Sequence, residues 1–134
     1  MLKKIAVGTA SFIVLDGVWL GVIMKSFYRE HLGPIAMTAP DGSLAPIWAA
    51  AAPVYVLMAL GLTVFVMPRV SRAAPLDAAK CGAVFGLVLF GVYDLTNLST
   101  LRNYSPMLAL IDTGWGIVSC AITAVVMKTV AGKS

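Results

Sequence analysis

The chain has 134 residues and a net charge of +4; 60% of its residues are hydrophobic and only 12% are charged. A soluble domain is about 45–50% apolar and about 25% charged, so the composition excludes an ordinary soluble domain, a disordered chain and a fibrous protein. The ten Lys and Arg residues are scattered in ones and twos between apolar runs, which excludes a continuous stripe for binding nucleic acid.

Four segments contain about 20 mostly apolar residues, the length with which a helix crosses a bilayer. They are residues 5–24, 47–67, 81–101 and 107–127. The first follows Lys3 and Lys4 as a signal peptide would, but its apolar run is too long and contains Asp16, so we interpret it as a retained helix. The sequence therefore predicts an all-α membrane protein with a single transmembrane domain over residues 1–134.

The connections predict an antiparallel four-helix bundle. Residues 25–46 are rich in Gly, Pro and charged residues, which is typical of a loop. The connection 102–106 is so short that the third and fourth helices must be antiparallel neighbours. With both ends in the cytoplasm, three basic residues lie outside (Lys25, Arg29 and Arg102) and seven lie inside (Lys3, Lys4, Arg69, Arg72, Lys80, Lys128 and Lys133). This imbalance favours an N-in, C-in orientation.

Three carboxylates, those of Asp16, Asp94 and Asp112, lie inside the predicted spans. A central Asp costs about 2.5–3.5 kcal/mol on insertion scales. At about 1.5 Å of rise per residue, all three fall in the middle-to-outer part of the membrane. A shared layer inside the bundle is the simplest arrangement that removes them from lipid.

Each carboxylate has aromatic or polar companions at helical spacing. Two D-x-x-W motifs place an Asp and a Trp on one helix face, and Asp94 lies in the most polar run of any span. The candidate ligand-binding residues are Asp16, Trp19, Tyr93, Asp94, Thr96, Asn97, Asp112 and Trp115. The alternative readings are hydrogen bonds that merely hold helices together, a cation or proton site, and a catalytic acid or base.

The sequence has few cysteine and histidine residues for a metal, redox or haem site. Cys81 and Cys120 lie 39 residues apart and His31 is the single histidine, so no zinc pattern, CxxC pair or bis-histidine haem site exists. No metal site is predicted, and no cofactor is assigned. In the first connection, Lys25, Tyr28, Arg29 and His31 could meet an anionic head group.

Several motifs together resemble the DUF2177 family of bacterial membrane proteins. They are F-x-x-x-D-x-x-W-L-G (Phe12 to Gly21), Phe27-Tyr28-Arg29, Leu32-Gly33, Y-D-L-T-N-L-S-T-L (Tyr93 to Leu101) and D-x-x-W-G (Asp112 to Gly116). The chain departs from the family at Pro53-Val54-Tyr55, where a more aromatic pair is expected. The resemblance implies a small four-helix protein of the bacterial inner membrane, often encoded near cyclopropane-fatty-acid-synthase-like and flavin amine-oxidase-like genes, an association with lipid modification.

These observations favour a polar intramembrane pocket that binds, or helps to modify, a lipid or another amphipathic ligand. Two alternatives stay open: a small cation- or proton-coupled transporter, and an accessory subunit of a larger membrane complex. The sequence does not decide whether the protein is an enzyme. The expected partners are membrane lipid and a second copy in a homodimer, with no nucleic acid.

Overall fold

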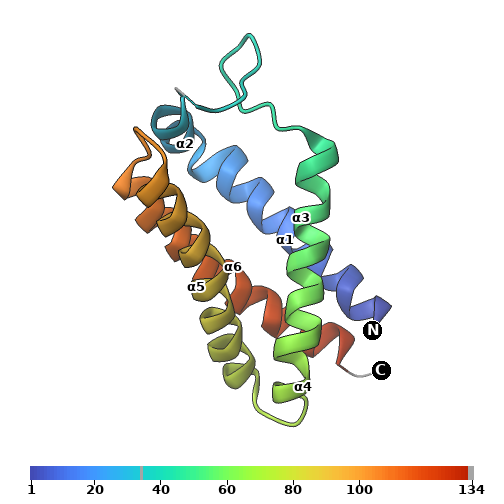
Figure 1. The fold of residues 1–134 in the computed structure, drawn as a ribbon. Coiled ribbons are helices and arrows are strands. Elements are labelled where there is room, and N and C mark those ends of the chain that lie inside the picture. The colour runs from blue at the N-terminus through green and yellow to red at the C-terminus, as the bar shows by residue number, and fades with distance from the viewer. Residues whose placement is uncertain (34, 133–134) are drawn as a thin grey trace.

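The computed structural model describes residues 1–33 and 35–132, and the chain within them is mostly helical (Figure 1). In chain order the elements are α1 (Leu2–Val18), the π-helical segment η1 (Trp19–Ile23), α2 (Lys25–Leu32), α3 (Trp48–Gly61), the π-helical segment η2 (Leu62–Val66), α4 (Met67–Val70), α5 (Pro75–Thr100) and α6 (Pro106–Ala131). The described residues form no strand. One isolated β-bridge joins Thr38 to Leu44 in the long connection before α3.

Four stretches are long and apolar enough to cross a membrane: Leu2–Ile23, Trp48–Val70, Pro75–Thr100 and Pro106–Ala131. This confirms the predicted all-helical class and the number of candidate spans. The third span begins at Pro75 rather than at residue 81, because its first turn is specified by end signals and not by hydropathy. Proline suits the first helical position, and the Asp77 carboxylate accepts a hydrogen bond from the Ala74 N–H at 3.1 Å.

The prediction of a loop over residues 25–46 is wrong for its first part, where Lys25–Leu32 forms α2. This helix is short and amphipathic, so an average of hydropathy does not reveal it. Its apolar side packs where α5 ends and α6 begins, and Tyr28 is buried there against a cluster that includes Tyr104 and Leu108. Lys25 and Arg29 lie on its exposed side.

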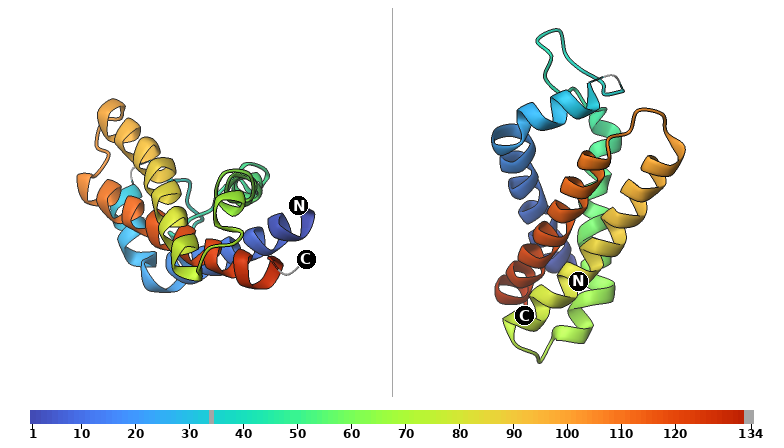
Figure 2. Two further views of the ribbon diagram at one scale, coloured as in Figure 1. Left: turned by 90° about the horizontal axis from the view of Figure 1, so that it is seen from below. Right: turned by 90° about the vertical axis from the view of Figure 1, so that its left-hand side faces the viewer.

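The four long helices lie in the order α3, α1, α6, α5. At one end η2 and α4, which follow α3, also contact α5 and α6. α1 lies between α3 and α6, and α6 packs along α5 (Figure 2). Gly82 and Gly86 bring the backbones of α5 and α6 together: a Cβ at Gly82 would lie 2.5 Å from the Cys120 carbonyl oxygen, and one at Gly86 would meet the Gly116 carbonyl oxygen. Small residues permit such close approach in membrane helices.

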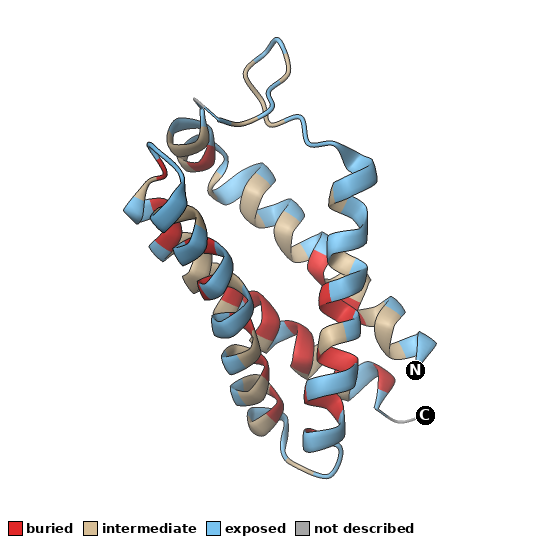
Figure 3. Ribbon diagram, in the orientation of Figure 1, coloured by how far each residue is buried: buried red, intermediate tan, exposed pale blue. Residues whose placement is uncertain are grey.

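Burial is uneven along α3 and explains where a cavity can form (Figure 3). Its second half joins the main apolar cluster through Met58, with Leu62 and Val66 of η2 beside it. Helix α4, which follows η2, is joined to α6, because Lys128 donates through Nζ to the Val70 carbonyl at 2.6 Å. By contrast, no residue from 48 to 57 is buried, so the first half of α3 stands apart from the other long helices.

Candidate functional site

Asp94 on α5 is fully buried and is held by two hydroxyl donors. The Tyr104 hydroxyl donates to Oδ1 at 2.8 Å, and the Thr113 hydroxyl donates to Oδ2 at 3.1 Å. Tyr104 comes from the connection between α5 and α6, where it also forms a side-chain hydrogen bond with Asn97. Burial, with Asp94 as the acceptor, raises the pKa of Tyr104, which keeps this hydroxyl protonated as a donor.

Asp112 on α6 lies beside Asp94. The two carboxyl groups are within hydrogen-bonding reach of each other, and Asp112 Oδ1 also accepts a hydrogen bond from the Tyr28 hydroxyl at 2.5 Å. Burial and the Asp112 carboxylate raise the pKa of Tyr28. Tyr28 therefore keeps its proton, and its oxygen accepts in turn from Trp19 Nε1 at 3.2 Å.

The two tryptophans of the D-x-x-W motifs stack on each other. The rings of Trp19 and Trp115 have centroids 4.4 Å apart and planes 2° from parallel. Trp115 Nε1 donates to Asp16 Oδ1 at 2.7 Å, and Asp16 forms a further side-chain hydrogen bond with Tyr55 on α3. The tryptophan of each motif is thus linked to the aspartate of the other. Trp115 donates directly to Asp16, and Trp19 is linked to Asp112 through Tyr28.

A continuous set of contacts therefore runs across the molecule from α5 to α3, and we call it the acid–aromatic chain. Its members, in order, are Tyr104, Asp94, Asp112, Tyr28, Trp19, Trp115, Asp16 and Tyr55. Each of its three carboxylates accepts at least one hydrogen bond from an aromatic side chain. The arrangement satisfies three carboxyl groups without any basic residue.

The eight candidate residues are only partly brought together. Five of them belong to the acid–aromatic chain: Asp16, Trp19, Asp94, Asp112 and Trp115. Asn97 touches the chain through Tyr104. Tyr93 and Thr96 lie on the exposed side of α5, with 60% of Tyr93 exposed, and neither belongs to the chain. Their assignment to a ligand site stays a prediction.

Three tyrosines and one threonine of this site were not predicted from the sequence: Tyr28, Tyr55, Tyr104 and Thr113. Tyr28 and Tyr104 lie outside the apolar spans, where interfacial anchoring is the ordinary expectation for tyrosine. One signal was available for Tyr28, which is part of the Phe27-Tyr28-Arg29 motif. Nothing in the sequence indicates the partners of the other three residues.

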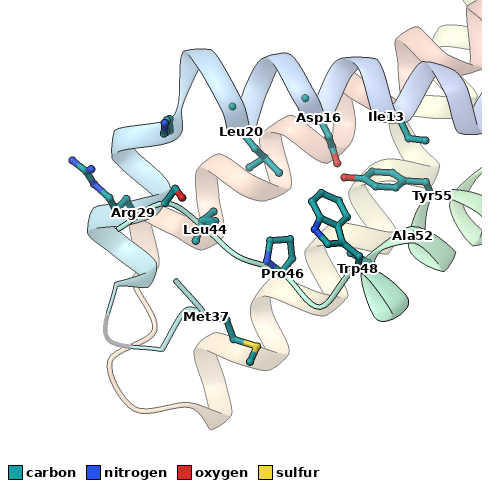
Figure 4. Close-up of a pocket in the computed structure, with 15 residues that line it drawn as sticks. Ile13, Asp16, Leu20, Arg29, Met37, Leu44, Pro46, Trp48, Ala52 and Tyr55 are labelled. Atoms are coloured by element: carbon teal, nitrogen blue, oxygen red, sulfur yellow. The ribbon is translucent and has the colours of Figure 1, made fainter. Parts of the chain in front are cut away.

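A large cavity of about 870 Å³ lies between α1, α2, the connection before α3, and α3 (Figure 4). Asp16 and Tyr55 point toward each other at one end of it, and Arg29 lies at the other end, with its guanidinium directed away from Asp16. The walls between these ends are mostly apolar and include Ile13, Leu20, Leu44, Pro46, Trp48 and Ala52.

A smaller cavity of about 280 Å³ is lined in part by Tyr28. Asp112 and Tyr104 of the acid–aromatic chain line it, together with Tyr93 and Asn97. The two cavities have no described lining residue in common, and different members of the acid–aromatic chain line each of them. Among residues 1–33 and 35–132, no three His, Cys, Asp or Glu side chains gather as metal ligands.

Comparison with known proteins gives one match. A family model described as "Predicted membrane protein (DUF2177)" matches residues 1–129, almost the whole chain. No curated protein and no solved structure matches it.

Proposed function

Because the chain belongs to the DUF2177 family of predicted membrane proteins, we propose that it is a multi-pass protein of the bacterial inner membrane that binds an amphipathic lipid. The binding site is the larger cavity, whose inner end is closed by Asp16 and Tyr55. The observation that carries this proposal is the cavity itself, which has apolar walls and polar groups at both ends. Ligand pockets in proteins commonly have this mostly apolar character, with a few placed polar groups.

The acid–aromatic chain supports the proposal by holding Asp16 in place. Trp115 fixes one carboxylate oxygen at 2.7 Å, and Trp115 is itself fixed by its stack on Trp19. Trp19 is anchored by Tyr28, which is anchored by Asp112. A side chain held by successive packed and hydrogen-bonded residues keeps its geometry. In this proposal Asp16 closes the inner end of the cavity, and the two tryptophans hold it there.

The proposed membrane arrangement is an antiparallel four-helix bundle with both ends in the cytoplasm. It is supported by the seven-to-three imbalance of basic residues, although Lys133 lies outside the described residues. It is also supported by the shared end at which α1 begins and α6 finishes (Figure 1). In this orientation the larger cavity lies in the outer half of the membrane.

Reporter fusions test the orientation. Fusions after Leu44 and Tyr104 are expected to report the outside, and fusions after Arg72 and Ser134 the cytoplasm, because the basic residues of the second connection stay inside. Paired alkaline-phosphatase and fluorescent-protein reporters measure this directly. A cytoplasmic signal from the Leu44 fusion would contradict the arrangement.

A cavity-filling substitution tests the binding function. Gly17 lines the cavity, and a Cβ built on it meets no atom within 4 Å. Gly17→Leu should therefore occupy the cavity without disturbing helix packing, and helix propensity favours the change. We expect loss of bound lipid, counted by native mass spectrometry of the purified protein, with an unchanged melting temperature.

The matched control is Gly114→Leu. A Cβ at Gly114 also meets no atom within 4 Å, but Gly114 does not line the cavity. This variant should keep its lipid. Equal lipid occupancy in Gly17→Leu and Gly114→Leu would show that the cavity is not the binding site.

A second candidate function, proton-coupled transport, is favoured by the contact between Asp94 and Asp112. Two carboxyl groups can hydrogen bond to each other only while one of them carries a proton. A proton held in this way inside the membrane, next to a cavity lined by Asp112, is a feature of proton pathways. The homodimer and the accessory-subunit role stay predictions.

A further inference from the structure

The short helix α2 presents its two sides to two different environments. Tyr28 faces inward and bonds to Asp112, whereas Lys25 and Arg29, four residues apart, line the larger cavity. Both cations are exposed, and no described residue forms a hydrogen bond or ion pair with either. The Asp41 carboxylate bonds to Ser43, and Lys25 acts on it only more weakly.

The other two head-group candidates named from the sequence, Tyr28 and His31, are engaged elsewhere. The hydroxyl of Tyr28 is committed to Asp112 and Trp19. His31 is within hydrogen-bonding distance of the Phe27 carbonyl through Nδ1, at 2.9 Å, and its ring stacks on Phe27 with centroids 4.1 Å apart. The set of four head-group candidates in the sequence therefore reduces to Lys25 and Arg29.

We propose that these two cations are the head-group site of the cavity and that the occupant is an acidic phospholipid. This inference rests on the proposed lipid-binding function and names its ligand class. Lys25 comes two residues after the end of the first span at Ile23, which places both cations at the depth of lipid phosphates. Arginine and lysine bind phosphate oxygens through charge-assisted hydrogen bonds.

The walls of the cavity suit an acyl chain below that phosphate, because they are mostly apolar between Lys25 and Asp16. Between these ends one chain would lie against Ile13, Leu20 and Ala52. A zwitterionic head group would bring a third cation beside Lys25 and Arg29, and like charges at close range repel. An acidic head group brings only negative charge to them.

The experiment compares two lipids, variants of the two cavity cations and one control arginine variant. The full chain is purified, and its binding of phosphatidylglycerol and of phosphatidylcholine is titrated by native mass spectrometry. We expect the wild type to prefer phosphatidylglycerol, and Arg29→Gln to weaken that binding about tenfold, with Lys25→Gln acting in the same direction. Arg102→Gln is the matched control, because Arg102 is exposed and falls on the same side in the proposed orientation but does not line the cavity.

Each outcome decides the proposal. Equal weakening by Arg29→Gln and Arg102→Gln, or equal binding of the two lipids, would overturn the head-group site. Displacement of the lipid by millimolar inorganic phosphate would overturn the phospholipid as the occupant, since the site would then recognise phosphate alone. The cavity proposal fails separately, when Gly17→Leu leaves lipid occupancy unchanged.

Discussion

Replacing Asp94 with leucine is expected to lower the free energy of unfolding by about 2–4 kcal/mol, whereas Asp94→Asn should stay within about 1 kcal/mol of the wild type. Leucine leaves the hydroxyls of Tyr104 and Thr113 without their acceptor in a buried place. Asparagine still accepts from Tyr104, and its amide group can donate to Thr113 and to Asp112. The difference between the two variants measures hydrogen bonding rather than charge.

Unfolding in detergent, followed by far-ultraviolet circular dichroism, measures these effects. Ser119→Ala is the control, because Ser119 is equally buried but bonds only within its own helix, at 3.4 Å to the Gly116 carbonyl. It should be almost silent. If Asp94→Leu were as stable as Ser119→Ala, the acid–aromatic chain would contribute nothing to stability.

The same asparagine variant separates the two candidate functions. Asn cannot release a proton, so Asp94→Asn should abolish proton flux in liposomes if the Asp94–Asp112 pair carries protons. Asp94 does not line the larger cavity, so lipid binding there should persist. Wild-type flux in this variant would exclude Asp94 from any proton pathway.

Gly86→Ala is expected to destabilise the protein by about 3 kcal/mol or more. The added Cβ would meet the Gly116 carbonyl oxygen and carbon, which are backbone atoms. Since backbone cannot rotate out of the way, α5 and α6 must separate along their closest contact. The measurement is again the unfolding free energy, with the yield of folded protein as a second readout.

Gly91→Ala provides the control on the same helix. Gly91 is also buried, but its added Cβ would lie 3.8 Å from Thr113 Cγ2, an ordinary contact. This variant should change the unfolding free energy by less than about 1 kcal/mol. A similar loss in both variants would mean that the α5–α6 contact has no special role and that any glycine in this helix is equally sensitive.

The candidate spans could be predicted because lipid imposes a length and a composition on any helix that crosses it. Hydropathy does not detect a helical segment that contains many polar residues. The first turns of α5 depend on Pro75 and Asp77. Helix α2 depends on having Tyr28 on its buried side and Lys25 and Arg29 on its exposed side. Both segments are too polar for hydropathy to detect, and their ends are set by local hydrogen bonds and by packing.

The candidate site could be predicted only as a set of side chains on separate helices. Spacing places Asp16 with Trp19, and Asp112 with Trp115, on one face of each helix. It does not reveal that Trp115 bonds to Asp16, or that Tyr28 links Trp19 to Asp112. Such pairings depend on how helices are rotated and displaced against each other. The sequence predicts a polar pocket among the three carboxylates, but not the larger cavity with its mostly apolar walls, which results from the separation of the first half of α3 from the other long helices.

The positions of the three tryptophans also give the protein its own optical probes. Trp19 and Trp115 stack within the acid–aromatic chain, while Trp48 is 70% exposed and lines the larger cavity (Figure 4). Indole emission depends on the polarity around the ring, so Trp48 reports whether the cavity holds water or an acyl chain. The transition dipoles of the stacked pair couple to each other, so the pair reports the distance between η1 and α6. Ligand occupancy and helix movement can therefore be followed separately by fluorescence without attaching a dye.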